Sequence, residues 1–194
     1  MTAALDRLLA EIRACRICAD HLPLGPRPTL QAGSKARILI IGQAPGTRVH
    51  ATGIPFNDPS GDRLRDWLGI GRDEFYDRDR IALVPQGFCY PGKGRGGDLP
   101  PRPECAPAWA AKVRGHMPKI ALTLLVGQYA QAHHLGDRRK DTLAATAEAY
   151  EEYLPAFWPI PHPSPRNLLW RRRNPWFERR VVPALRETVR SLLM

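Results

Sequence analysis

The sequence predicts an α/β fold, a three-layer α/β/α sandwich around a central four-stranded parallel sheet. Short runs of apolar, branched residues recur along the chain, a pattern typical of strands buried on both faces. Segments with apolar residues at helical spacing lie between these runs, and this alternation favours a parallel sheet covered by helices on both sides. No internal repeat or long low-complexity linker divides the 194 residues, so we expect one domain over 1–194.

Four segments have the strand pattern. The clear ones are residues 36–42, 80–84 and 120–127, and a weaker one is 156–160. In parallel sheets the active site lies beyond the carboxyl ends of the strands. We therefore expect the functional residues to come just after these four segments.

Helical periodicity occupies the stretches between the strands and both ends of the chain. The N-terminal segment places Leu5, Leu8, Leu9 and Ile12 on one face. The other helical segments are residues 60–68, 104–117, 128–135 and 175–193. Because the N-terminal segment has an early acidic residue and no long apolar core, we expect no secretory signal and no membrane association. The sequence thus predicts a cytoplasmic protein.

The chain is strongly basic. Lys and Arg total 29 against 19 Asp and Glu, which gives a net charge of +10 and a pI near 10.0. Arginines are concentrated between positions 166 and 180. This charge indicates a polyanionic partner, and nucleic acid is favoured over a membrane because no long basic amphipathic helix stands alone.

Four cysteines have the spacing of a metal site. Cys15 and Cys18 form a C-x2-C pair, and Cys89 and Cys105 follow as widely spaced single residues. In a reducing compartment such a set binds metal more often than it forms disulfides. Zinc modules usually bring two close pairs, whereas an iron–sulfur cluster tolerates irregular spacing. The spacing of the cysteines alone supports zinc and an iron–sulfur cluster almost equally well.

Motifs along most of the chain resemble the iron–sulfur uracil-DNA glycosylases. The segment RACRICAD (13–20) and the span from Cys89 to Cys105 match the cluster layout of that family. GQAPG (42–46) follows the first strand, GIPF (53–56) follows at the family's distance, and HPSPRN (162–167) matches its His-Pro-Ser loop. The resemblance implies a monomeric enzyme that flips uracil out of single- or double-stranded DNA, and a [4Fe-4S] cluster on the four cysteines.

The resemblance also implies roles for residues at the active site. His162 is expected to donate a hydrogen bond to uracil O2 as negative charge builds on the departing base. Phe56 is expected to stack on the flipped base. Gly42, Gln43 and Ala44 belong to a loop whose backbone approaches the base and sugar closely.

DNA contacts are expected from the His-Pro-Ser loop and the basic segment after it. Ser164 is expected to hold a phosphate, with Asn167 and Arg171 beside it. Arg166 stands where the family often has a bulky apolar wedge. It could fill the gap left by the flipped base or contact a phosphate, and the two interpretations are even.

Two departures from the family pattern bear on the chemistry. Ala44 stands where many relatives have a water-orienting aspartate, so Asp58 is the carboxylate to test, although the stronger interpretation is that Asp58 or Ser60 simply caps the helix that begins near Gly61. Pro85 stands where the family has an asparagine that reads the base edge, and Gln86 is the candidate substitute. The altered pocket leaves room for other bases, such as hypoxanthine or xanthine.

Two alternative functions remain open. The chain could be a superfamily relative that binds uracil or abasic DNA with little turnover, which the missing Asn and Asp favour. A zinc-stabilised nucleic-acid-binding domain is the third possibility. Release of free base separates the first two, and visible absorption of the purified protein separates zinc from an iron–sulfur cluster.

Overall fold

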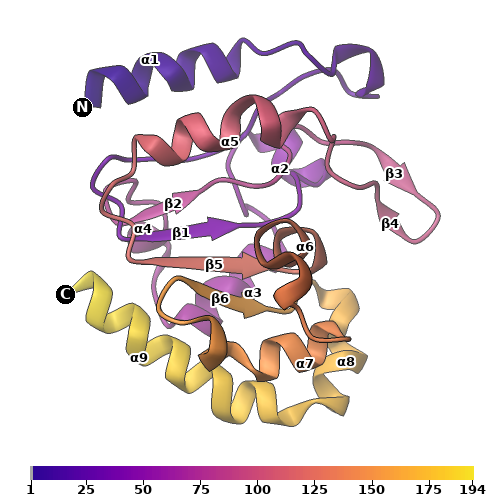
Figure 1. Cartoon of the computed structure of the whole chain (residues 1–194). Helices are drawn as coiled ribbons and strands as arrows, with labels where there is room; N and C mark the ends of the chain where they lie inside the picture. The colour runs from indigo at the N-terminus through magenta and orange to yellow at the C-terminus, as the bar shows by residue number, and fades with distance from the viewer. Residues whose placement is uncertain (1) are drawn as a thin grey trace.

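The computed structural model describes residues 2–194, and its centre is a parallel sheet in the order β2-β1-β5-β6 (Figure 1). The strands are β1 (Ile38–Ile41), β2 (Ile81–Leu83), β5 (Leu122–Val126) and β6 (Phe157–Ile160). Ile38 of β1 pairs with Ile81 on one side and Leu122 on the other. All four predicted strands are present, each trimmed by one or more residues at its ends.

Helices cover both faces of this sheet, as the sequence predicts (Figure 1). Their bounds are α1 (Thr2–Arg13), α2 (Thr47–Thr52), α3 (Pro59–Leu68), α4 (Arg72–Phe75), α5 (Cys105–Gly115), α6 (Gln128–Leu135), α7 (Leu143–Glu148), α8 (Leu168–Arg173) and α9 (Val182–Leu193). A π-helical segment, Phe177–Val181, leads directly into α9.

Alternate residues of each strand serve two separate cores. Ile38 and Ile40 of β1 face a cluster that contains Trp67 of α3 and Leu185 of α9. The intervening residues of β1, Leu39 and Ile41, belong to a second cluster with the apolar faces of α1, α5 and α6. Because the strands are apolar on both faces, they must be covered on both, and the three-layer α/β/α sandwich is confirmed.

The short helices α2, α4, α7 and α8 are not among the predicted segments, and two further features differ from the predicted pattern. The segment between the second and third sheet strands contains a small antiparallel hairpin, β3 (Lys93–Gly94) and β4 (Gly97–Asp98), which projects beyond the sheet (Figure 1). The predicted helix over 175–193 is present without a break, but it contains the π-helical segment before α9 begins at Val182. Within residues 2–194 no helix has the length and apolarity to cross a bilayer.

The carboxyl ends of all four strands point to the same edge of the sheet, where the β3–β4 hairpin, α6 and α8 gather (Figure 1). The loops that follow β1 and β6 start at this edge. The fold therefore brings the GQAPG and HPSPRN segments together, as expected of a parallel sheet.

Candidate active site

A cleft with a cavity volume of about 790 Å³ lies at this edge of the sheet. Its walls come from segments that are distant in sequence: the loop after β1, the start of α3, the β3–β4 hairpin, the start of α6 and the loop after β6. A smaller pocket adjoins it, and Gln43, Ala44, Asp58 and His162 line both. The smaller pocket also contains Phe56. The aromatic ring and the histidine that the sequence singled out therefore share one pocket.

Phe56 is held in an unusual backbone conformation. Among residues 2–194 it is the one non-glycine residue with positive φ, at 54°, a region that costs such residues on the order of 1–3 kcal/mol. Two glycines make the position possible. A Cβ atom at Gly42 would lie 3.1 Å from Phe56 Cζ, and one at Gly61 would lie 1.7 Å from the Phe56 carbonyl oxygen. The fold thus fixes this ring against the loop after β1.

The orientation of His162 is set by its own loop. The Ser164 backbone N–H donates a hydrogen bond to His162 Nδ1 at 3.2 Å. A neutral ring with an acceptor at Nδ1 carries its proton on Nε2, which makes Nε2–H the available donor. The Asn167 side chain donates to the His162 carbonyl oxygen at 2.7 Å, and Gly127 packs beneath the ring. The histidine is therefore held in one tautomer and one place.

Burial keeps His162 neutral. Removal from water lowers the pKa of the imidazole, and the nearby carboxylates of Asp58 and Asp98 raise it by a smaller amount, so that the net shift is downward. The ring is therefore uncharged near neutral pH. A neutral imidazole can donate a hydrogen bond to a charge that develops in the pocket without giving up its proton.

Asp58 has a structural contact as well as a place in the pocket. Its Oδ1 atom accepts a hydrogen bond from the Gly61 backbone N–H at 2.8 Å and caps the N-terminus of α3. It also lines both the cleft and the smaller pocket. The helix-cap interpretation is correct, and whether Asp58 also acts in catalysis stays a prediction.

Of the other residues predicted for the base pocket, three line it and one does not. Gly42, Gln43 and Ala44 line the smaller pocket, and the Gln43 side chain donates to the Leu99 carbonyl oxygen at 2.9 Å, which ties the loop after β1 to the chain following β4. Gln86 is buried and is not among the lining residues. Its neighbour Pro85 lines the pocket instead. The structure therefore does not bring the Gln86 amide to the place where a base edge would be read.

Three of the four expected DNA-contact residues lie in the cleft. Ser164, Arg166 and Asn167 line it, and Ser164 Oγ accepts a hydrogen bond from the Arg166 backbone N–H at 3.3 Å. Arg171 is elsewhere. Its side chain is only 11% exposed and pairs with Glu178 at 3.1 Å, so its charge is already engaged within the protein.

The cleft contains residues that the sequence did not single out. Gln128 and Tyr129 begin α6, directly after β5, where the rule for parallel sheets could have indicated them. Tyr90 and Asp98 come from the chain between Cys89 and Cys105. The hairpin strands there are only two residues long, which leaves no periodicity for a sequence to reveal.

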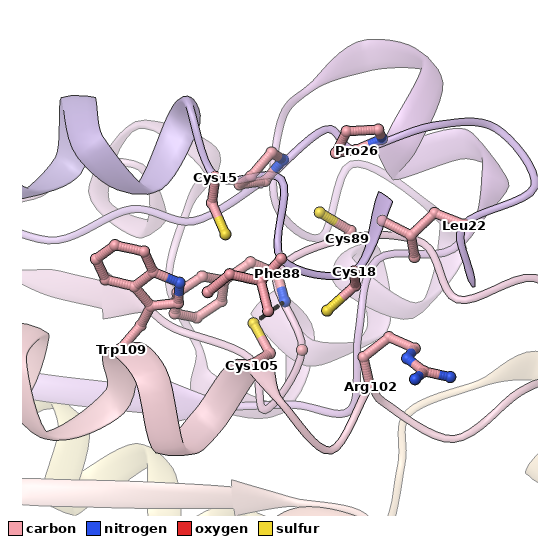
Figure 2. Close-up of a pocket in the computed structure, with 12 residues that line it drawn as sticks. Cys15, Cys18, Leu22, Pro26, Phe88, Cys89, Arg102, Cys105 and Trp109 are labelled. Atoms are coloured by element: carbon pink, nitrogen blue, oxygen red, sulfur yellow. Dashed lines mark hydrogen bonds between the residues drawn. The ribbon is translucent and has the colours of Figure 1, made fainter. Parts of the chain in front are cut away.

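The four cysteines come from three distant segments and line one pocket (Figure 2). Cys15 and Cys18 follow α1, Cys89 follows β2, and Cys105 is the first residue of α5. Figure 2 shows their sulfur atoms around a common space, with Phe88 and Trp109 beside it. Burial raises the pKa of the Cys89 thiol and raises that of Cys105 to about 12.

Polar groups around the sulfurs suit a bound metal cluster. The Phe88 backbone N–H donates to Cys105 Sγ at 3.3 Å, and the Trp109 indole Nε1 is buried without a partner among the described residues. Hydrogen bonds to sulfur are a usual feature of iron–sulfur sites. In residues 2–194 no three His, Cys, Asp or Glu side chains are arranged to hold a metal ion.

A comparison with protein-family models finds a match over most of the chain. The model described as the uracil DNA glycosylase superfamily matches residues 30–186. The matched span contains the loops after β1 and β6, the β3–β4 hairpin, and both Phe56 and His162. It includes Cys89 and Cys105 but leaves Cys15 and Cys18 outside.

Proposed function

The chain belongs to the uracil DNA glycosylase superfamily, and from that premise we propose that it is a monofunctional uracil-DNA glycosylase. Superfamily membership indicates a DNA glycosylase, a hydrolase of DNA repair. The observation that supports uracil as the base is the pocket in which Phe56 and His162 lie together at the carboxyl edge of the sheet. An aromatic face and one fixed hydrogen-bond donor suit a flat base that leaves as an anion.

The proposed reaction begins with the base leaving the DNA stack. The glycosidic bond is not accessible inside a duplex, and extruding a base costs a few kcal/mol. Stacking on an aromatic ring is worth about 1–3 kcal/mol per base. Phe56, fixed by Gly42 and Gly61, offers such a face without having to rearrange. The strained backbone at Phe56 is thus consistent with a ring preorganised for its ligand.

His162 then assists departure of the base. As the bond between the sugar and the base breaks, negative charge grows on the uracil oxygens. The Nε2–H of His162, whose tautomer follows from the Ser164 hydrogen bond, donates to that charge. Removing one such preorganised donor typically lowers turnover by about 100- to 1000-fold. Because burial lowers the pKa of His162, the donor is the neutral ring.

DNA is held by the walls of the cleft. Ser164, Arg166 and Asn167 are in position to contact the backbone on one side, and Lys93 of the hairpin is on the other. With a net charge of +10, binding is expected to weaken steeply as salt concentration rises. We include in the proposal a monomeric, cytoplasmic enzyme acting on uracil in single- or double-stranded DNA.

We further propose that Cys15, Cys18, Cys89 and Cys105 hold a [4Fe-4S] cluster. Support comes from their shared pocket, the N–H donor on Cys105 Sγ and the unpaired indole of Trp109. When bound, such a cluster would supply covalent cross-links between distant segments. The two ligands Cys89 and Cys105 bracket the β3–β4 hairpin. Their fixation would hold the hairpin over the cleft.

The test is release of free base by purified, cluster-replete protein under single-turnover conditions. Uracil DNA should give an abasic site without strand cleavage, and His162→Gln should lose most of the rate while binding DNA normally. DNA carrying hypoxanthine, xanthine or thymine belongs in the same assay, because Pro85 rather than an amide lines the pocket. Binding of uracil DNA without release of any base would reject the glycosylase and favour a uracil- or abasic-DNA-binding protein.

A further inference from the structure

One acidic side chain lies free in a cleft that is otherwise suited to a polyanion. Asp98, on β4 of the hairpin, lines the cleft with His162 and Arg166. Within the described part of the chain its carboxylate forms no hydrogen bond and no ion pair, although the protein carries a net charge of +10. The carboxylate therefore remains available to whatever enters the cleft.

Hydrogen bonds fix the part of the backbone that carries this carboxylate. The Leu99 backbone N–H donates to the Gly92 carbonyl oxygen at 2.9 Å, and Leu99 accepts from the Gln43 side chain. Asp98 Oδ2 lies 3.4 Å from where a Cβ atom of Gly46 would be. Gly46 also lines the smaller pocket with Phe56 and His162. Asp98 is thus at the junction between the base pocket and the open cleft.

The opposite wall lies close to the same hairpin. A Cβ atom at Gly97 would be 2.9 Å from Arg166 Nη1. The hairpin and the loop after β6 therefore meet next to Asp98. A nucleotide whose base occupies the smaller pocket and whose phosphates follow the cleft would place its sugar between these two parts of the site.

A carboxylate at this point opposes DNA binding. It repels phosphate and offsets the attraction that Lys93 and Arg166, which line the same cleft, exert on the DNA backbone. The repulsion becomes a net benefit only if positive charge appears nearby during the reaction. Cleavage of a glycosidic bond produces that charge on the sugar, and electrostatic stabilisation of a developing charge is a major source of catalysis.

We propose that Asp98 faces the deoxyribose of the flipped nucleotide and stabilises the cation that forms when the glycosidic bond breaks. This rests on the proposed glycosylase function. The bond between C1′ and the base nitrogen breaks with both electrons leaving on the base. A water oxygen then bonds to C1′ and loses its extra proton to solvent, and the base anion takes up one proton from solvent. Asp98 stays ionised throughout.

Asp58 does not fulfil the same role equally well. One of its oxygens accepts the Gly61 N–H as the cap of α3, and that contact fixes the loop carrying Phe56. Asp98 has no such engagement among residues 2–194. The two carboxylates near His162 are therefore assigned different tasks, with Asp58 positioning the Phe56 loop and Asp98 facing the sugar.

The experiment compares two DNA ligands that need no turnover. One carries a protonated pyrrolidine ring in place of a deoxyribose, which mimics the sugar cation, and the other carries an uncharged tetrahydrofuran ring. We expect the wild-type protein to bind the cationic DNA at least about tenfold more tightly at low salt. Asp98→Asn should lose most of this preference while binding the neutral DNA as tightly as the wild type or more so.

Two further variants keep the comparison specific. Asp98→Glu should retain most of the preference. Asp73→Asn removes the same charge from an exposed residue of α4, at the opposite edge of the sheet, and should leave the preference unchanged (Figure 1). An Asp98→Asn protein that keeps the wild-type preference, or a wild-type protein without any preference, overturns the proposal. Absence of base release by the wild type would instead overturn the glycosylase assignment, and the binding ratios would still report on Asp98.

Discussion

Replacing Gly127 by alanine tests whether the position of His162 determines the rate of base release. Gly127 lies between β5 and α6 with φ +80° and ψ 179°, and a Cβ atom there would lie 3.3 Å from His162 Cβ and 3.6 Å from Cδ2. The new methyl group must push the imidazole by a few tenths of an ångström or bend the loop. Gly136, at the other end of α6, also has positive φ (+52°), but no atom lies within 4 Å of its Cβ position.

The two alanine variants should therefore share one effect and differ in another. A non-glycine residue in such a backbone region costs on the order of 1–3 kcal/mol. In a chain of this size each kcal/mol lowers Tm by roughly 2–4 °C, so both proteins should melt several degrees below the wild type. Displacement of a catalytic group by 1 Å can cost about 100-fold in rate. A shift of a few tenths of an ångström should cost Gly127→Ala about 3- to 30-fold.

The assay is single-turnover base release from uracil DNA, with thermal melting measured on the same samples. Gly127→Ala should lose rate in addition to stability, and Gly136→Ala should lose stability alone. Equal rates in the two variants would contradict the view that close packing beneath His162 sets its catalytic position. A large loss of rate in Gly136→Ala would contradict it as well.

Three other predictions follow from individual contacts. Asp58→Ala should lower the free energy of unfolding by about 1 kcal/mol, because it removes the α3 cap. Asp58→Asn keeps a capping oxygen and should have normal stability. A loss of base-release rate in Asp58→Asn would therefore reveal a catalytic role for the carboxylate. Burial lowers the pKa of His134 to about 4, below its ordinary value, so its contribution to stability is complete above pH 6.5 and is lost as the pH falls through 4. After allowance for its partial exposure the loss is about 1–2 kcal/mol, and urea unfolding of His134→Gln at pH 7 and pH 4 should show a smaller pH dependence than the wild type. Trp109→Phe keeps an aromatic ring but removes the buried indole N–H. Because a hydrogen bond to sulfur raises the reduction potential of an iron–sulfur cluster, the potential of the proposed cluster should become more negative in this variant. An unchanged potential would mean that the indole N–H does not donate to a sulfur atom.

The sheet could be predicted because its strands are apolar on both faces. The segments Ile38–Ile41 and Leu122–Val126 have no exposed polar face, and such a short run that is apolar on both sides is typical of a parallel strand covered by helices on both faces. Short elements escaped prediction for the opposite reason. Helix α7 has six residues, three of them alanine, and half of the residues of the β3–β4 hairpin are glycine, so neither displays a periodic apolar face.

The residues of the candidate site also divide into those that the sequence predicts and those that it does not. His162 follows from a motif at a strand end, because the parallel sheet dictates where those ends lie. Phe56 lies between α2 and α3 and follows from the resemblance of GIPF to the family motif. The pairing of Arg171 with Glu178 depends on how α8 meets the π-helical segment, and sequence shows the charge without showing its partner. Asp98 reaches the cleft through a loop whose path is set by tertiary contacts, among them the Gln43 hydrogen bond to Leu99.

The most direct measurement is a crystal structure of the protein with DNA that carries a non-hydrolysable deoxyuridine analogue. The uracil should lie outside the helix with its face against Phe56 and its O2 within hydrogen-bond distance of His162 Nε2, and its sugar should face Asp98. A base that remains stacked in the DNA, or one bound away from both Phe56 and His162, would contradict the proposed function.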